Sequence, residues 1–154
     1  MDETTGSADE AILVVFTVGD GVYGVDVSQV REIASMHDTT PMPDAPDYVD
    51  GVTNLRGQVT TVTNLRRRFG LPDKENDDRS RVIVVEPDGV PVGMVVDSVS
   101  EVLRMPADAI EPVPDILMES GGAEIDSEYI EGVGKQGDGA LIILLDLEKL
   151  LAAA

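Results

Sequence analysis

The amino-acid sequence repeats itself, and the repeat limits the folds that it can adopt. Four segments of the first half recur in the same order in the second half. The matched segments are 14–20 with 82–88, 24–33 with 93–102, 48–52 with 129–133, and 64–65 with 146–147. Glycine, tyrosine and acidic residues recur together with the valines, so we interpret the pattern as a duplication rather than as chance similarity between Val-rich segments.

Each copy predicts the same series of short elements. Residues 12–18 form an unbroken, mostly β-branched and aromatic run, which is typical of a buried strand. The turn Gly19-Asp20-Gly21 predicts a hairpin, with residues 22–27 as the returning strand. After it, Ser28 predicts the cap of a short helix with Val30 and Ile33 on its apolar side.

The rest of the copy consists of a Pro-rich passage, two further strands and a second short helix. That helix is predicted to run from Asn64 to Gly70. Several short strands with tight turns and no long helix predict a mainly β fold built from small barrels. Two copies predict two barrels related by an approximate two-fold axis.

Each copy is too small for a generous core of its own, so we expect the barrels to share an apolar seam. We expect them to cover about residues 10–71 and 81–151, with some exchange of elements. The acidic tail 1–9 is predicted to be disordered, and 152–154 forms a second tail. A partner would bind in the groove between the barrels.

The composition excludes several classes of function. The 154 residues include 30 acidic and 11 basic side chains and no cysteine. This charge argues against binding to nucleic acid, and no apolar run is long enough to be inserted directly into a membrane. Without a signal peptide, the chain is expected to be cytoplasmic. The acidic surface is typical of a halophilic protein, in which high salt screens the repulsion.

Catalytic and metal-binding patterns are weak. Gly19–Gly24 matches a dinucleotide-binding pattern, but a strand rather than a long helix is predicted to follow it. His37 is the only histidine, and we expect it to be exposed and without a catalytic role. Residues 73–78 carry acids at alternate positions, yet lack the glycine and closing Glu of a calcium loop. These observations favour an interaction module without cofactor or metal; an acidic barrel that binds calcium or a small ligand is the alternative.

The segment 49–59 contains the clearest candidate site. It runs through a corner of sequence Asn54-Leu55-Arg56-Gly57, which the second copy replaces with Lys135-Gln136-Gly137. Turn geometry explains the glycines, but the turn does not need an arginine. Arg56 therefore either forms an ion pair with a nearby acid such as Glu32, or contacts a partner, or does both.

Several motifs resemble those of the CheW-like family of chemotaxis coupling proteins. The similarity covers about residues 10–151. It is carried by Phe16–Asp20, Tyr23–Val27, Val30-Arg31-Glu32-Ile33, Gly51–Gly57 and the closing segment 141–150. The family often has Pro where Thr61 stands and Asp where Asn64 stands.

The resemblance implies two packed, pseudo-repeated, five-stranded SH3-like β-barrels with short helices. It also implies a non-catalytic scaffold that couples the cytoplasmic tips of methyl-accepting chemoreceptors to the regulatory domain of the histidine kinase CheA, and so controls its autophosphorylation. Such a protein is recruited to membrane-associated receptor arrays. The positions that match the family's coupling residues, together with Val99 as the repeat-mate of Val30, are Val30, Glu32, Gly51, Asn54, Arg56, Gly57 and Val99.

Overall fold

The structure is a computed structural model that describes residues 10–36, 38–87, 89–112, 127–137 and 139–151. Both predicted tails and His37 lie outside the described residues. The strands are β1 (Glu10–Val18), β2 (Gly21–Asp26), β3 (Val30–Ser35), β4 (Val49–Leu55), β5 (Gln58–Asn64), β6 (Arg81–Val85), β7 (Val92–Val96), β8 (Ser98–Pro106), β9 (Ile110–Glu111), β10 (Ile130–Lys135) and β11 (Leu141–Leu145). The helices are η1 (Val27–Gln29), α2 (Leu65–Arg68), η2 (Ala107–Ala109), η3 (Ser127–Tyr129) and α4 (Leu147–Leu150).

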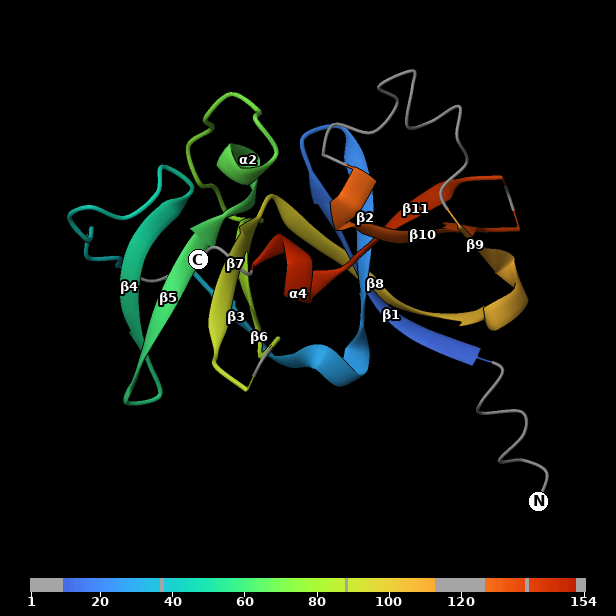
Figure 1. Ribbon diagram of the computed structural model, residues 1–154, viewed down its shortest axis with the longest axis horizontal. Helices are drawn as coiled ribbons and strands as arrows, with labels where there is room; N and C mark the ends of the chain where they lie inside the picture. The colour runs from blue at the N-terminus through green and yellow to red at the C-terminus, as the bar shows by residue number, and fades with distance from the viewer. Residues whose placement is uncertain (1–9, 37, 88, 113–126, 138, 152–154) are drawn as a thin grey trace.

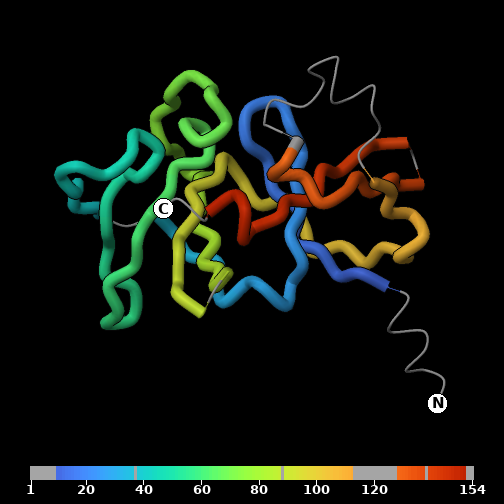
Figure 2. Tube along the Cα trace, in the orientation of Figure 1, coloured from blue at the N-terminus to red at the C-terminus, as the bar shows by residue number. Residues whose placement is uncertain are grey.

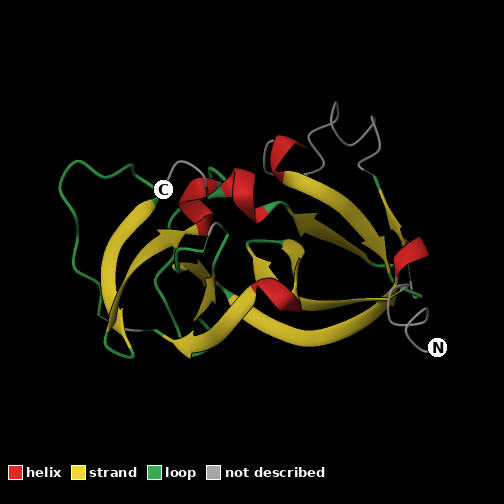
Figure 3. Cartoon of the chain, turned by 60° about the horizontal axis from the view of Figure 1, so that its bottom comes forward, coloured by secondary structure: helices red, strands yellow, loops and turns green. Residues whose placement is uncertain are grey.

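The strands form two sheets that lie side by side (Figure 1 and Figure 3). Barrel A has the order β8-β1-β2-β11-β10-β9, and barrel B has the order β3-β6-β7-β5-β4. The predicted mainly β fold with two packed barrels and short helices is thus confirmed. No helix in the described ranges is long and apolar enough to cross a membrane.

The two copies exchange their first hairpins. The repeat makes β1, β2, β3, β4 and β5 equivalent to β6, β7, β8, β10 and β11. Under this mapping the order of barrel B becomes that of barrel A, except for the two-residue strand β9. Each barrel therefore takes the first hairpin of one copy and its other strands from the other copy, so the chain crosses between barrels at β2–β3 and at β7–β8 (Figure 2). Neither sheet is made of residues from one half of the chain.

The exchanged hairpins are buried on both faces, which explains their unbroken apolar runs. In β1, Val14, Phe16 and Val18 pack in the cluster shared by the two barrels, whereas Leu13 and Val15 pack inside barrel A. The same alternation occurs in β6. Ile83 and Val85 pack in the shared cluster, and Val82 and Val84 pack inside barrel B. The shared cluster is the seam that the size of the copies led us to expect.

One predicted element is wrong. Residues 27–29 form only a short 3-10 turn, and the cap is Asp26, whose carboxylate accepts a hydrogen bond from the Ser28 N–H at 2.9 Å. From Val30 the chain is a strand, not a helix, and it pairs with β6. Pairing with a strand from the other copy overrides the local helical spacing of Val30 and Ile33. The second predicted helix is present as α2, which is shorter than the predicted range 64–70 and is capped by Asn64.

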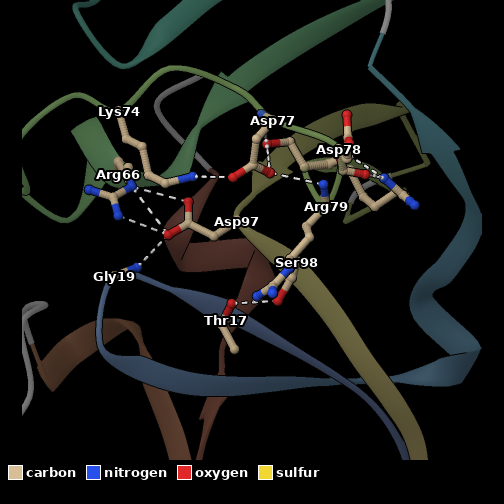
Figure 4. A network of polar contacts seen from close by, with 11 residues as sticks. Thr17, Gly19, Arg66, Lys74, Asp77, Asp78, Arg79, Asp97 and Ser98 are labelled. Carbon is tan, nitrogen blue, oxygen red and sulfur yellow. Dashed lines mark hydrogen bonds and ion pairs between the residues drawn. The ribbon is translucent and has the colours of Figure 1, made fainter.

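A polar network connects the barrels at the β7–β8 crossing (Figure 4). Asp97 accepts hydrogen bonds from Arg66 of α2 and from the Gly19 N–H in the β1–β2 turn, at 2.9 and 2.8 Å. Next to it, the Thr17 and Ser98 hydroxyls lie 2.7 Å apart. Burial opposes the ionisation of Asp97, but the bonds from Arg66 and Gly19 outweigh it and lower its pKa. An ionised Asp97 thus holds the helix of one barrel to the hairpin of the other.

Candidate functional site: a corner of barrel B

The tip of the β4–β5 hairpin places Arg56 at a corner of barrel B. Leu55 pairs with Gln58, so the loop has two residues, Arg56 and Gly57, with φ of 54° and 82°. Positive φ at both positions gives the turn geometry that suits the twist of a hairpin. The Asn54 side-chain oxygen accepts a hydrogen bond from the Gly57 N–H at 2.9 Å. Asn54 and Gly57 thus shape the turn, while Arg56 adopts a backbone conformation that is uncommon for a residue with a side chain.

Arg56 forms the expected ion pair with Glu32. Its Nε lies 2.8 Å from Glu32 Oε1, yet 81% of the Arg56 side chain is exposed, against 22% for Glu32. A bulge at the start of β3, between Val30 and Glu32, shifts the register with β6. Beside the pair, Arg31 donates to the Gln58 side chain at 3.2 Å. Two contacts from adjacent residues of β3 therefore fasten the hairpin tip across this corner.

The equivalent corner of barrel A is open. Glu101 matches Glu32 in the repeat, and it lines a cavity of about 430 Å³ together with Met105, Lys135 and Gln136. The corner around Arg56 in barrel B encloses only about 50 Å³. Lys135, at the tip of barrel A, lies 4.0 Å from Glu111 rather than bridging to β8. The two copies thus differ at the corner where the first carries Arg56.

Gly51 supports the hairpin from its other end. It has a φ of 141°, and a Cβ on it would lie 2.0 Å from the Thr40 carbonyl oxygen. This close approach lets Thr40 form a bridge with Val52, which holds the chain after β3 against β4. Gly132 of β10 also lies against a neighbouring backbone, but less closely, because a Cβ on it would be 3.0 Å from the Glu111 carbonyl oxygen of β9. Gly51 is therefore needed for the fold of barrel B and does not itself present a surface.

Val30 and Val99 lie at equivalent places on the two barrels. Each is partly buried, and each packs against the shared cluster at the start of a strand that follows a crossing. The structure thus brings Glu32, Asn54, Arg56 and Gly57 together at one corner, while Val99 belongs to the other barrel. Each cavity described here is lined by one barrel, so a groove between the barrels stays a prediction.

Sequence reasoning missed the run Arg66-Arg67-Arg68 in α2. Three of the 11 basic residues are adjacent here in a chain of net charge −19, which is the signal that could have revealed them. Arg67 pairs with Asp73 at 2.9 Å and lies 3.7 Å from Asp50. Arg68 contacts the faces of Tyr48 and Tyr129, with its guanidinium carbon 4.6 Å from each ring centre. These arginines are engaged within the protein.

The charged loop proposed for calcium is held by its own ion pairs. Lys74 lies 2.8 Å from Asp77, and this bond together with the Arg79 N–H lowers the pKa of Asp77 to about 2. Asp73 is bound by Arg67. Within the ranges that the structure describes, no three His, Cys, Asp or Glu side chains are grouped so that they could hold a metal ion.

Known proteins share both this sequence and this fold. The sequence model of the CheW-like domain matches residues 13–154. The chain is 36% identical to the chemotaxis protein CheW of Klebsiella aerogenes, over 91% of this chain and 81% of that protein. It is 32% identical to the chemotaxis protein CheW of Treponema pallidum, over 92% and 82% of the two chains.

A solved structure agrees with these sequence matches. The crystal structure of the scaffolding protein TtCheW from Thermoanaerobacter tengcongensis superposes with a TM-score of 0.80 at 34% identity, over 91% of this chain and 86% of that one. The matches cover both barrels and the corner at Arg56. The chain therefore belongs to the CheW-like domain family.

Proposed function

We propose that this protein is a non-catalytic chemotaxis adaptor. It couples the cytoplasmic tips of methyl-accepting chemoreceptors to the regulatory domain of the histidine kinase CheA, and so controls autophosphorylation of the kinase. Membership of the CheW-like family supports the scaffold role. The adaptor acts in the cytoplasm, where its partners recruit it to membrane-associated receptor arrays.

The observation that carries the proposal is the exposed arginine on a fixed corner. The hairpin turn and the bond to Glu32 restrict Arg56, while most of its side chain stays in solvent. The bond to Glu32 uses Nε, so the two terminal nitrogens can donate to a carboxylate on a partner. In a chain of net charge −19, such a cation also gives local complementarity to an acidic partner surface.

Of the other predicted site residues, some would contact a partner and the others hold Arg56 and its turn in place. Val30 and Val99 supply apolar contact beside the seam, which suits a helical hairpin that presents an apolar stripe. Glu32 orients Arg56. Gly51, Asn54 and Gly57 maintain the backbone that presents the corner.

A pull-down tests the proposal. The receptor cytoplasmic fragment and CheA would be offered separately and together to the wild-type protein and to Arg56→Ala. Arg79→Ala, which removes an exposed cation from the charged loop, is the matched control. We expect the wild type and Arg79→Ala to retain both partners and support kinase activation, and Arg56→Ala to lose coupling while keeping its fold. Failure of the wild type to bind either partner would refute the proposal, and full activation by Arg56→Ala would refute the role of Arg56.

A further inference from the structure

One arginine lies between matching residues of the two barrels. Tyr48 precedes β4 of barrel B, Tyr129 precedes β10 of barrel A, and the two tyrosines are equivalent in the repeat. The Arg68 guanidinium carbon is 4.6 Å from the centre of each ring. Cation–π contacts of this kind strengthen as the pair is removed from water, and all three side chains are partly buried.

Arg68 also makes two directional bonds into barrel A. Its Nε donates to the carbonyl oxygen of Leu150 at 3.0 Å, and a terminal nitrogen donates to the Tyr129 hydroxyl at 2.9 Å. In the repeat, Leu150 is the residue equivalent to Arg68. The arginine of α2 therefore bonds to its own counterpart at the end of α4.

Each tyrosine is in turn fixed to the helix of its own barrel. The Asn64 N–H donates to the Tyr48 carbonyl at 2.7 Å, and the Asp146 N–H donates to the Tyr129 carbonyl at 2.9 Å. Asn64 and Asp146 cap α2 and α4. A rotation of one barrel against the other would therefore break the stacking on Tyr129 and both directional bonds of Arg68 together, while Tyr48 would move with Arg68.

The apolar seam does not impose the same restriction. Its members are mostly aliphatic side chains from both sheets, and apolar burial is non-directional. Apolar contacts therefore define the angle between the barrels less sharply than the planar fork of an arginine, which has a narrow choice of geometry. The Asp97 network is a second directional link, and it joins α2 to the β1–β2 turn.

From these contacts we propose that Arg68 is a positioning residue that sets the angle between the two barrels, and that coupling depends on this angle. The second part rests on the proposed adaptor function, because a scaffold must hold its partner surfaces in a fixed relation. The first part concerns the chain alone and can be measured without partners.

Distances between spin labels test the first part. The chain has no cysteine, so cysteines introduced at Val59 of barrel B and Val102 of barrel A are the only labelling sites; both valines are well exposed. We expect one narrow distribution of distances in the wild type, at least a twofold wider one in Arg68→Met, and an intermediate width in Arg68→Lys. Lysine keeps the charge but cannot reproduce the planar fork.

Two controls separate this effect from loss of the fold. Arg67→Met removes the adjacent arginine, whose partners Asp50 and Asp73 lie on barrel B and on the loop after α2. The distribution of distances between the labels at positions 59 and 102 should therefore keep its wild-type width. A label pair within barrel B, at Ile33 and Val59, should remain narrow in every variant. If Arg68→Met does not fold, Arg68→Lys alone still decides the question, because a wild-type width in that variant would refute the proposal.

Kinase activation in a reconstituted assay with receptor and CheA tests the second part. We expect Arg68→Met to lower it at least fivefold and Arg67→Met to leave it unchanged. The proposal would be overturned if the distance distribution of Arg68→Met had the wild-type width. It would also be overturned if that distribution were wider and the variant still activated the kinase fully. A wild-type protein that fails to couple receptor and kinase would refute the adaptor function instead, and the distance measurement would stand independently.

Discussion

Asn64 and Asp146 occupy matching positions in the two copies, and each accepts a hydrogen bond at 3.2 Å from the backbone N–H three residues later. Their electrostatic surroundings differ. The Asn64 side chain offers its NH₂ group, 3.5 Å away, to both carboxylate oxygens of Asp50. The equivalent of Asp50 is Glu131, which experiences the negative charge of Asp146 where Asp50 has an amide. Burial, Asp146 and Asp26 together raise the pKa of Glu131.

We predict that Asp146→Asn stabilises the protein at neutral pH. Asn caps a helix as well as Asp does, and the substitution removes a repulsive charge. The folded-state pKa of Glu131 is raised, so its ionised form lowers stability above that pKa, and this loss disappears as the pH falls through it. The gain should therefore be complete at pH 7, at under about 1 kcal/mol because solvent screens the charges, and should fade towards pH about 4. Urea unfolding in low salt at both pH values measures it.

The reverse exchange provides the control. Asn64→Asp keeps the cap of α2 but replaces the amide beside Asp50 with a second carboxylate, so it should lower stability at pH 7. A loss of stability in Asp146→Asn at pH 7 would show that the anion at the start of α4 matters more than its repulsion of Glu131.

A substitution at Arg56 should raise the stability of the protein and at the same time abolish its coupling function. The residue has a positive φ of 54°, which Asn tolerates far better than Arg in this type of turn. The ion pair that Arg56→Asn removes is mostly exposed and contributes under about 1 kcal/mol. We therefore expect Arg56→Asn to raise the unfolding free energy by about 0.5 kcal/mol while it abolishes kinase coupling. Denaturant unfolding and a reconstituted kinase assay on the same preparation check both halves; a loss of more than about 1 kcal/mol would contradict the first.

Two glycines of the same hairpin should differ sharply in their tolerance of alanine. At Gly51 a Cβ would collide with the backbone of Thr40, whereas at Gly57 no atom lies within 4 Å and only the positive φ opposes a side chain. We expect Gly51→Ala to cost about 3 kcal/mol or more, and Gly57→Ala about 1 kcal/mol. Urea unfolding measures both. Equal losses would mean that the segment at Thr40 can move away from β4.

Sequence reasoning reached the duplication because glycine, tyrosine and acidic residues recur in both copies in the same order as the valines. It also anticipated the pair of Arg56 with Glu32, since an isolated cation in an acidic chain seeks a carboxylate. It did not reveal how the hairpins are exchanged, because the strands are equivalent by repeat whichever barrel they join. The short helix predicted after Ser28, with Val30 and Ile33 on its apolar side, was wrong because these residues pair with β6, a strand that is distant in sequence. Arg68 was missed for the same reason, since the fold alone brings Tyr48 and Tyr129 to its two faces.

Salt should stabilise this protein by screening its acidic surface. The 30 acidic side chains outnumber the 11 basic ones, and such an excess destabilises a compact chain through self-repulsion. Raising the ionic strength from about 0.1 to 1 M shortens the screening length from about 10 to 3 Å. Exposed ion pairs such as Lys74 with Asp77 weaken too, but each contributes little. We therefore expect the Tm to rise between 0.1 and 1 M KCl.

The choice of cation distinguishes screening from specific binding. If screening alone acts, MgCl₂ or CaCl₂ at the same ionic strength as KCl should give the same Tm. A Tm that climbs with millimolar CaCl₂ at constant ionic strength would instead support the calcium-binding alternative, despite the ion pairs that hold Asp73 and Asp77. A Tm that falls as KCl is added would contradict the prediction, because it would show that the ion pairs stabilise the protein more than the excess of carboxylates destabilises it.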